Sequence, residues 1–452
     1  MIRRVFLSII LAALVGAGQF GFAQAAPGSG TAQTKTPIQH LVVLLQENHT
    51  FDNYFGTYPG ADGIPANTSM PVNLKDPSAG SIQPWHIGNS TITDLSHTGA
   101  TFRGQYDNGK MDGFVSYLNG LNQNGQLSMG YYNEVDIPYY WNLADNYVLF
   151  DRLFSSAADG SFANHMYWVA GVSPQALRGQ KLSDVLKNVP TIFDRLQAAG
   201  VSWKFYVENY DPTITYRNQS NAGNRASQVI WVPLLNFDRF IDDPTLSSHI
   251  VDLNQYYTDL QQGTLPSVAY IVPSGASEHP PQKPVTGERT VKNLIQELMR
   301  STSWDSSAFM LLYDDWGGWY DHVVPPQVDN FGYGLRVPGL LVSPYARKGF
   351  IDNTQLDFTS VLKFIEENWN VPTLASRDAA ASNFLEAFDF QQAPRSPEFL
   401  TSTRNNVVAT KKDPSHIIYS TYGFAVLLSL LVIGIAYLRH FFSRPAPVEN
   451  TR

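Results

Sequence analysis

The sequence predicts an α/β fold built around a mostly parallel β-sheet. Apolar runs of strand length recur along the chain, and segments whose apolar residues have helical spacing stand between several of them. Strands that are apolar nearly throughout are typical of a parallel sheet that helices cover on both faces. Hydrophobic residues make up 43% of the 452 residues, so the chain can build a large core and is not a mostly disordered protein.

The expected elements follow one another along the central part of the chain. Each expected strand is a short apolar run, and each expected helix repeats apolar side chains three and four residues apart. The expected strands are residues 38–45, 147–154, 201–207, 268–272, 308–313 and 339–342, and the expected helices are residues 191–199, 291–300 and 358–368. Residues 62–130 are richer in Gly, Asn, Ser and Pro, so we expect loops and short elements there that lie over the sheet and could form a substrate lid.

The N-terminus has the pattern of a secretory signal peptide. Arg3 and Arg4 precede an apolar run at residues 5–15, and Ala23-Gln24-Ala25 resembles a cleavage site. A buried N-terminal helix would explain the apolar run but not its flanks. We therefore expect a signal peptide at residues 1–25, followed by a linker at residues 26–36.

A second apolar segment stands near the C-terminus. Residues 417–438 contain no formal charge and are long enough to span a bilayer core, which takes about 20 apolar residues. We expect a transmembrane helix there, preceded by a linker at residues 393–416 and followed by a cytoplasmic tail at residues 439–452. The single body domain, residues 37–392, is then expected at the cell membrane on its extracytoplasmic side.

Charge and cysteine content exclude several classes of function. The chain has 31 Lys and Arg against 39 Asp and Glu, a formal net charge of −8, which argues against a nucleic acid scaffold as partner. It contains no cysteine, which excludes disulfides, thiolate zinc sites and a cysteine nucleophile.

Polar clusters follow three of the expected strands. Glu47 and Asn48 follow the first, His279 follows residues 268–272, and Asp314-Asp315 follows residues 308–313. In an open α/β sheet, ligands bind beyond the carboxyl ends of the strands. Adjacent carboxylates repel each other unless a cation or hydrogen-bond donors compensate, and these oxygens suit a divalent ion. The alternative is that the Asp pair caps a helix or forms a turn before two glycines.

Ser161 is the candidate nucleophile. It follows Gly160 and could open a helix, where backbone N–H groups and the helix dipole favour anions. A bound metal could activate its hydroxyl. The alternative is an ordinary N-cap serine. The sequence lacks the G-x-S-x-G, H-E-x-x-H and P-loop patterns, which argues against an α/β-hydrolase, a zincin and a nucleotide kinase.

Five motifs in order resemble those of the bacterial phosphoesterase family, which includes non-haemolytic phospholipases C and certain acid phosphatases. Residues 46–56 read QENHTFDNYFG and resemble the family's QENRSFDHYFG. His97 and residues 109–115 resemble its H…GKMDGF stretch, and residues 160–165 are similar to its nucleophile turn. Residues 278–280 resemble its DHP, and residues 313–323 resemble its YDEHGGFYDHV.

The resemblance implies an alkaline-phosphatase-like three-layer sandwich that holds one divalent metal ion, whose identity stays open. Ser161 would be the nucleophile, and His97 and His279 would contact phosphoryl oxygens or transfer the leaving-group proton. A structural role for His322 is at least as consistent with its motif. The metal ligands would be Glu47, Asn48, Ser161, Asp314 and Asp315.

The chain departs from the family motifs at a few positions. His49 and His165 stand where the family has arginines, Gly160 where it has a proline, and Asp315 where it usually has Glu. Exchanging arginine for histidine changes how a site binds phosphate or carboxylate.

The sequence therefore predicts a membrane-tethered hydrolase of phosphoric esters, phospholipase C-like, that acts through a phosphoseryl intermediate on Ser161. A phosphate ester or a phospholipid is the expected substrate. One alternative is an acid phosphatase that acts on phosphomonoesters. Another is an envelope binding or adhesion protein that kept the fold and lost the chemistry.

Overall fold

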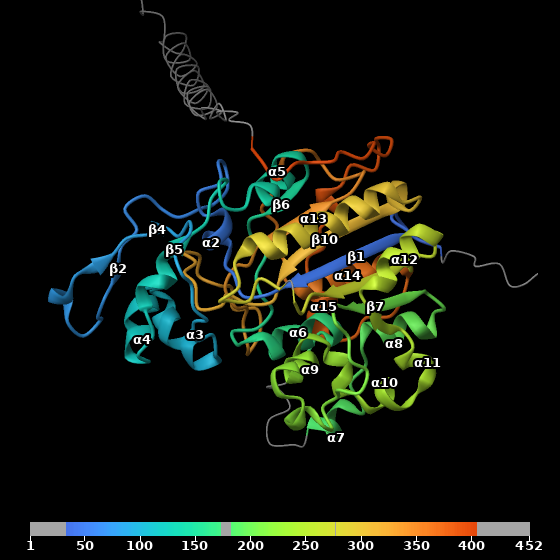
Figure 1. The fold of residues 1–452 in the computed structure, drawn as a ribbon, viewed down its shortest axis with the longest axis horizontal. Coiled ribbons are helices and arrows are strands. Elements are labelled where there is room, and N and C mark those ends of the chain that lie inside the picture. Colours follow the sequence, from blue (N-terminus) through green and yellow to red (C-terminus); the bar gives the residue numbers. More distant parts are fainter. Residues whose placement is uncertain (1–32, 173–181, 276, 405–452) are drawn as a thin grey trace, which may run out of the picture.

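The computed structural model describes residues 33–172, 182–275 and 277–404, and at its centre lies one β-sheet (Figure 1). Within these residues the sheet has eight strands in the order β12-β6-β11-β10-β1-β9-β7-β8. β11 is antiparallel to both of its neighbours, and every other pairing is parallel. The strands are β1 His40–Gln46, β6 Val148–Phe150, β7 Trp203–Val207, β8 Ile250–Asp252, β9 Val268–Val272, β10 Ser307–Tyr313, β11 Gly339–Val342 and β12 Phe350–Asp352.

Helices cover the sheet on both faces, so the body has three layers (Figure 1). α5, α12 and α13 lie over one face, and α6, α8 and α14 lie over the other. The helices of eight or more residues are α3 Gly99–Tyr106, α5 Pro138–Asn146, α6 Ser161–Ala170, α12 Asn254–Gln262, α13 Pro284–Arg300 and α14 Phe358–Trp369. The shorter helices are α2 Phe51–Phe55, α4 Phe114–Gly120, α7 Leu182–Leu186, α8 Ile192–Ala198, α9 Gln228–Trp231, α10 Asp238–Asp242, α11 Pro244–Ser247 and α15 Ser376–Ala380.

The α/β class and the mostly parallel sheet predicted from the sequence are confirmed. All six expected strands and all three expected helices form, with ends that differ by a few residues in most cases. α13 begins seven residues before the expected helix, because Pro284 starts it and its first two turns contain the buried Gly287 and Glu288 instead of an apolar stripe. Glu288 has a local role, since its carboxylate accepts the backbone N–H of Tyr139 at the start of α5.

Residues 62–130 form a lobe beside the sheet that has a small core of its own (Figure 1). It contains α3, α4 and the short strand pairs β2 Met70–Pro71 with β3 Ser81–Ile82, and β4 Trp85–His86 with β5 Gly130–Tyr131. Phe102, Phe114 and Met129 of this lobe pack against Trp316 and Tyr320, which follow β10. The lobe therefore rests on the segment that carries the Asp pair; whether it moves as a lid stays a prediction.

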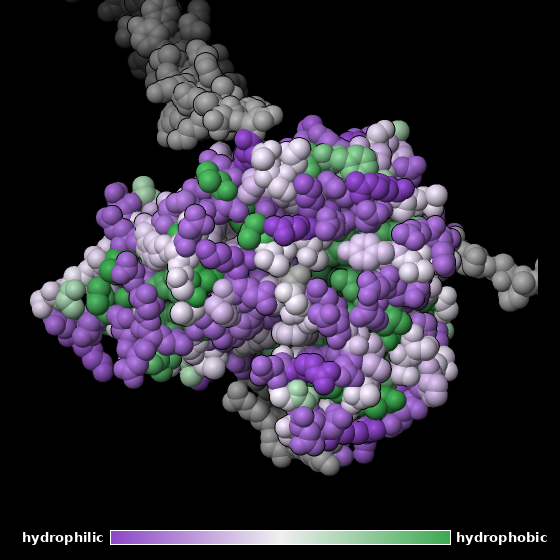
Figure 2. All heavy atoms as spheres, in the orientation of Figure 1, coloured by the Kyte–Doolittle hydropathy of each residue, from purple (hydrophilic) through white to green (hydrophobic). Residues whose placement is uncertain are grey.

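The surface is mostly hydrophilic on the face drawn in Figure 2, with hydrophobic residues in small scattered groups. The expected signal peptide (1–25) and transmembrane helix (417–438) lie outside the described residues. Within the described residues, no helix is long and apolar enough to cross a membrane. Residues 393–404, the described part of the expected second linker, lie along the body, where the backbone oxygen of Arg395 accepts a hydrogen bond from Trp304 Nε1 at 3.0 Å.

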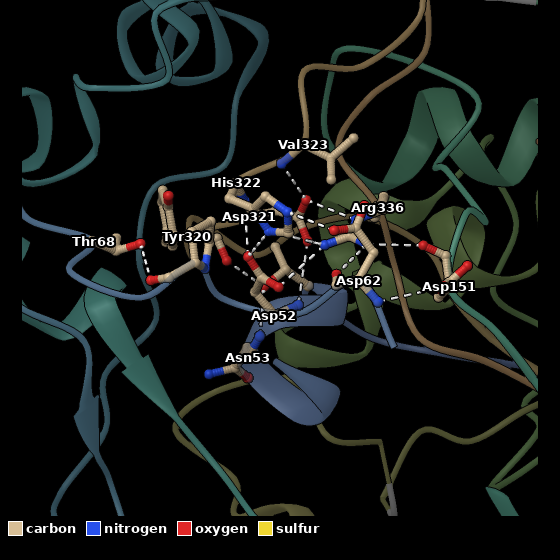
Figure 3. Close-up of polar contacts among 12 residues, drawn as sticks. Asp52, Asn53, Asp62, Thr68, Asp151, Tyr320, Asp321, His322, Val323 and Arg336 are labelled. Atoms are coloured by element: carbon tan, nitrogen blue, oxygen red, sulfur yellow. Dashed lines mark hydrogen bonds and ion pairs between the residues drawn. The ribbon is translucent and has the colours of Figure 1, made fainter. Parts of the chain in front are cut away.

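A buried ion-pair cluster joins α2 to the segment that follows β10 (Figure 3). Arg336 is fully buried, and its guanidinium donates to both oxygens of Asp321, at 2.9 and 3.1 Å, and to Asp52 Oδ1 at 3.1 Å. His322 Nδ1 lies 2.8 Å from Asp52 Oδ2, and its Nε2 lies 3.2 Å from Asp62 Oδ1. The cluster thus fixes the two chain segments that follow β1 and β10 and carry Glu47 and Asp314.

Removing the guanidinium of this cluster should destabilise the fold strongly. Arg336→Met keeps most of the side-chain volume but leaves two buried carboxylates without their cation, and we expect the free energy of unfolding to fall by about 3–5 kcal/mol. Urea unfolding of the full chain measures this loss. Arg225→Ala, which breaks an exposed ion pair with Asp211, is the control and should have a much smaller effect. Equal losses in the two variants would contradict a structural role for the cluster.

Candidate active site

The register of β1 and β10 brings two acidic segments together. The strands are parallel neighbours and pair Gln46 with Tyr313, so the residues that follow leave the sheet at the same edge. The backbone N–H of Asn48 donates to Asp314 Oδ1 at 3.0 Å, which ties the two segments to each other. Glu47 and Asn48 therefore lie beside Asp314 and Asp315, although more than 260 residues separate them in the chain.

Two backbone features make this close approach possible. Asn48 has a φ of 67°, in the left-handed region that asparagine tolerates better than most residues. Gly317, with a φ of 57°, lies directly against it, since a Cβ on Gly317 would stand 2.3 Å from the backbone oxygen of Asn48. Gly317 is therefore required for two reasons: its backbone has a positive φ, and there is no room for a side chain at its position.

Ser161 reaches the same place from the other side. It is the first residue of α6, and its hydroxyl donates to Asp315 Oδ2 at 3.1 Å. Gly160 precedes it, and a Cβ there would come within 3.0 Å of the backbone oxygen of His97. The glycine thus lets the start of α6 approach the segment that carries His97.

A cavity of about 720 Å³ opens beside these residues, and Glu47, Ser161, His97 and His279 all line it. The rings of His97 and His279 lie 5.9 Å apart, edge to face. Nδ1 of His97 lies 2.7 Å from the backbone oxygen of Leu95, and Nδ1 of His279 lies 2.7 Å from that of Pro280. Because a carbonyl only accepts, Nδ1 carries the hydrogen in each ring. The other residues that line the cavity are Asn224, Ser227, Ile230, Trp231, Ser274, Ser277, Pro280, Pro281 and Gln282.

Three buried oxygens of the acidic set have no hydrogen-bond partner among the described residues. They are Glu47 Oε2, Asn48 Oδ1 and Asp314 Oδ2, on side chains that are at most 2% exposed. Buried carboxylate oxygens are costly unless donors or a cation compensate them. These residues therefore fit the divalent cation that the family resemblance implies.

The acidic groups shift one another's pKa values. Burial and the charge of Asp314 raise the pKa of Glu47 to about 8. Burial and the same charge raise the pKa of Asp315. Burial acts on Asp314 in the same direction, but the nearby charge of His165 and the hydrogen bond from the backbone of Asn48 outweigh it and lower the pKa of Asp314. Burial alone would lower the pKa of His97, but the charge of Asp315 and the other contacts of the ring raise it to about 9. Without a metal, Glu47 and His97 therefore bind protons more tightly than usual, because positive charge is needed to offset the buried carboxylates.

His165 is a site residue whose place the sequence did not reveal. Its ring is fully buried, and its Nε2 lies 3.2 Å from Glu47 Oε1 and 3.7 Å from Asp314 Oδ2. Burial lowers its pKa, but the contact with Glu47 and the negative charges of Glu47 and Asp314 outweigh burial and raise the pKa to about 9. The only sequence signal was its departure from the arginine of the family motif.

Glu278, next to His279, lies outside the metal set. Its buried carboxylate accepts hydrogen bonds from three tyrosine hydroxyls, those of Tyr54, Tyr140 and Tyr313, at 2.5, 2.5 and 2.7 Å. Burial raises its pKa to about 7. These bonds anchor the loop between β9 and α13 at the residue next to His279, which lines the cavity.

The structure places all seven candidate residues around one cavity and its buried edge; their roles stay predictions. Ser161 is hydrogen-bonded to Asp315, Glu47 and Asn48 adjoin Asp314, and the two histidines line the cavity together with Glu47 and Ser161. His322 lies in the Arg336 cluster instead, hydrogen-bonded to Asp52.

The metal-free protein should lose stability as pH rises from about 5 to 9. Glu47 and His165 have pKa values of about 8 and 9 in the fold, against 4.5 and 6.5 as unperturbed groups, so the folded state binds more protons in this range and its stability falls. A divalent cation replaces those protons, so it should raise the unfolding temperature more at pH 8 than at pH 5. Thermal unfolding with chelator and with Zn²⁺ or Mg²⁺ measures both effects.

Glu47→Gln is the matched variant for this measurement, because it removes one proton site without changing the side-chain size. We expect it to flatten the pH dependence of the chelated protein and to reduce the cation's effect. A cation effect equal at both pH values would contradict the assignment of these groups.

Comparison with known proteins places the chain in a family. The sequence model of the Phosphoesterase family matches residues 38–372. The chain is similar to phospholipase C B of Mycobacterium tuberculosis, at 27% identity over 79% of this chain and 79% of that protein. It is 26% identical to the non-hemolytic phospholipase C of Pseudomonas aeruginosa, over 80% of this chain and 58% of that protein. It is 27% identical to non-specific phospholipase C1 of Arabidopsis thaliana, over 79% of this chain and 72% of that protein.

Solved structures include more distant likenesses. A protein in the alkaline phosphatase superfamily from Vibrio parahaemolyticus is 13% identical, with a TM-score of 0.36, over 79% of this chain and 73% of that one. The lipoteichoic acid synthase LtaP from Listeria monocytogenes is 9% identical, with a TM-score of 0.37, over 74% of this chain and 73% of that one. From the match to the family model, the chain belongs to the Phosphoesterase family, which confirms the assignment from its motifs and makes it a phosphoric ester hydrolase.

Proposed function

We propose that this protein is a phospholipase C-like, metal-dependent hydrolase of phosphoric diesters that acts through a phosphoseryl intermediate on Ser161. The observation that carries the proposal is the position of the Ser161 hydroxyl, at the start of α6 and 3.1 Å from Asp315 Oδ2. The same buried acidic set includes oxygens of Glu47 and Asp314 that have no hydrogen-bond partner in the part of the chain that the structure describes. The names of the similar proteins, which include phospholipases C from bacteria and a plant, support the substrate class.

Ser161 acts as the nucleophile in the first step. Its oxygen attacks phosphorus, and its proton passes to Asp315 Oδ2, which already accepts its hydrogen bond. The new bond joins the serine oxygen to phosphorus while the bond from phosphorus to the alcohol oxygen breaks. Water then cleaves the phosphoseryl bond, which returns the serine hydroxyl and releases the phosphorylated head group. When bound, a divalent cation supplies positive charge that favours the serine alkoxide and offsets the charge of the phosphoryl oxygens.

The two histidines have different surroundings, which favours different roles. His97 lies near the acidic set, with Nε2 3.4 Å from Asn48 Nδ2, and its raised pKa favours a cation that binds a phosphoryl oxygen. His279 lies on the loop after β9 and lines the cavity, and its Nδ1 donates to the backbone oxygen of Pro280. Its Nε2 is therefore the ring nitrogen that can give a proton to the departing alcohol, and we assign it that role.

Replacing the nucleophile should abolish turnover and leave the fold intact. Ser161→Ala is expected to lose hydrolysis of phosphatidylcholine and of p-nitrophenyl phosphate, with an unchanged circular dichroism spectrum. The unmodified protein should act faster on the lipid diester; a preference for the monoester would instead favour an acid phosphatase. Ser376→Ala changes the first residue of α15, which is exposed, and should keep full activity. Retained turnover in Ser161→Ala would refute the proposed nucleophile, and no hydrolysis of either substrate by the unmodified protein would favour a binding function.

The role of His279 can be tested through the leaving group. A p-nitrophenolate departs without a proton, whereas the alcohol of a lipid needs one, so His279→Gln should lose roughly 10²–10⁴-fold on phosphatidylcholine and much less on p-nitrophenyl phosphorylcholine. His97→Gln is the comparison, and it should lose similar factors on both substrates because phosphoryl binding is common to them. The measurement is kcat/KM of each variant on each of the two substrates. Equal losses on both substrates in His279→Gln would contradict the assignment of His279 as the proton donor.

A further inference from the structure

His165 lies among the acidic residues of the site, on the same side of α6 as Ser161, four residues further along the helix. Its ring is fully buried between the backbone oxygen of Trp231 and the carboxylates of Glu47 and Asp314. Nδ1 lies 3.1 Å from the backbone oxygen of Trp231, and Nε2 lies 3.2 Å from Glu47 Oε1 and 3.7 Å from Asp314 Oδ2. The ring thus bridges α9 and the carboxylates.

The contact with Trp231 determines which ring nitrogen carries a hydrogen. A carbonyl oxygen can only accept, so Nδ1 of His165 donates to it and Nε2 is the nitrogen that faces the carboxylates. Histidines that bind metals typically have this arrangement, in which one nitrogen donates to a carbonyl or carboxylate and the other holds the ion.

The distances around Nε2 also fit a shared ion. Two atoms that bind one ion at about 2.0–2.2 Å lie roughly 2.8–3.8 Å apart when the angle between them is about 90–120°. The separations of Nε2 from Glu47 Oε1 and Asp314 Oδ2, 3.2 and 3.7 Å, fall in that range. Asp314 Oδ2 and Glu47 Oε2 are also among the buried oxygens without a hydrogen-bond partner in the described residues.

We propose that His165 binds the active-site cation through Nε2, so that the site has a mixed nitrogen and oxygen ligand set. The inference rests on the proposed function, because it concerns the same cation. Imidazole ligands suit Zn²⁺, Fe²⁺ and similar ions, whereas sites made of oxygen alone suit Mg²⁺ and Ca²⁺. His165 therefore makes this site selective for a transition metal. The arginine of the family motif could not take this role, since its guanidinium keeps its charge and has no lone pair to donate.

The competing role for His165 is that of a fixed positive charge, an imidazolium that pairs with Glu47 and Asp314 as an arginine would. The two roles differ in what an arginine can replace. His165→Arg would preserve a fixed charge but not a ligand, whereas His165→Ala removes both.

The test measures metal affinity and the ligand atoms directly, in the full chain stripped of metal. Competition titrations with Zn²⁺ and Mg²⁺ should show that His165→Ala and His165→Arg each lower Zn²⁺ affinity by about 100-fold or more and change Mg²⁺ affinity by less than about 10-fold. His249→Ala is the matched control, because His249 also has Nδ1 bonded to a backbone carbonyl, that of Trp203, but lies outside the acidic set. It should leave both affinities unchanged.

Pulsed electron paramagnetic resonance of bound Mn²⁺ detects a nitrogen ligand directly, and its first result comes from the unmodified protein, whose folding no substitution can disturb. Imidazole coordination should give nitrogen modulation in the unmodified protein and in His249→Ala, and both His165 variants should lose it. A bound ion without nitrogen modulation, modulation that survives in a His165 variant, or unchanged Zn²⁺ affinity in His165→Arg would overturn the inference and leave the proposed function intact. Failure of the unmodified protein to bind any divalent ion would overturn the proposed metal-dependent function as well.

Discussion

The parallel pairing of β1 with β10 is the constraint on which the site depends. Both strands are fully buried at their centres and end in register at Gln46 and Tyr313, so the residues that follow emerge side by side at one edge of the sheet. A slip of one residue would turn the side chains of one strand to the other face and separate the two acidic segments. The buried guanidinium of Arg336 holds both segments just beyond the strands.

The negative charges gathered at this edge of the sheet create the need for hydrogen-bond donors and a cation. Glu47, Asp314 and Asp315 are buried together, where each raises the energy of the others' charged forms. Backbone donors, the hydroxyl of Ser161 and the ring of His165 offset part of that cost, and a cation would offset the rest. In the proposed function, phosphoryl transfer needs positive charge at the same position, so one bound cation would both stabilise the fold and assist catalysis.

The central part of the fold could be predicted because strands buried on both faces are apolar whatever their neighbours are. The edge strands β8 and β12 could not, since each has only three residues, includes an aspartate and is recognisable only by its pairing with the neighbouring strand, β7 for β8 and β6 for β12. The start of α13 was missed for a related reason, because its first turns bury Glu288 against α5 rather than an apolar stripe. β8, β12 and the first turns of α13 are stabilised by tertiary contacts, which the local sequence pattern does not reveal.

The fold class and the five ordered motifs could be recognised from the sequence by itself, and the motifs supplied the seven candidate residues that the structure brings to one cavity and its buried edge. Apolar strands and short motifs are local patterns, so they can be recognised without knowing the tertiary structure. Only the tertiary structure decided that His165 faces two carboxylates and that three tyrosines hold Glu278 beside His279. Those contacts join side chains from separate layers of the fold. Their distances depend on how helices pack on the sheet, which the spacing of residues along the chain does not specify.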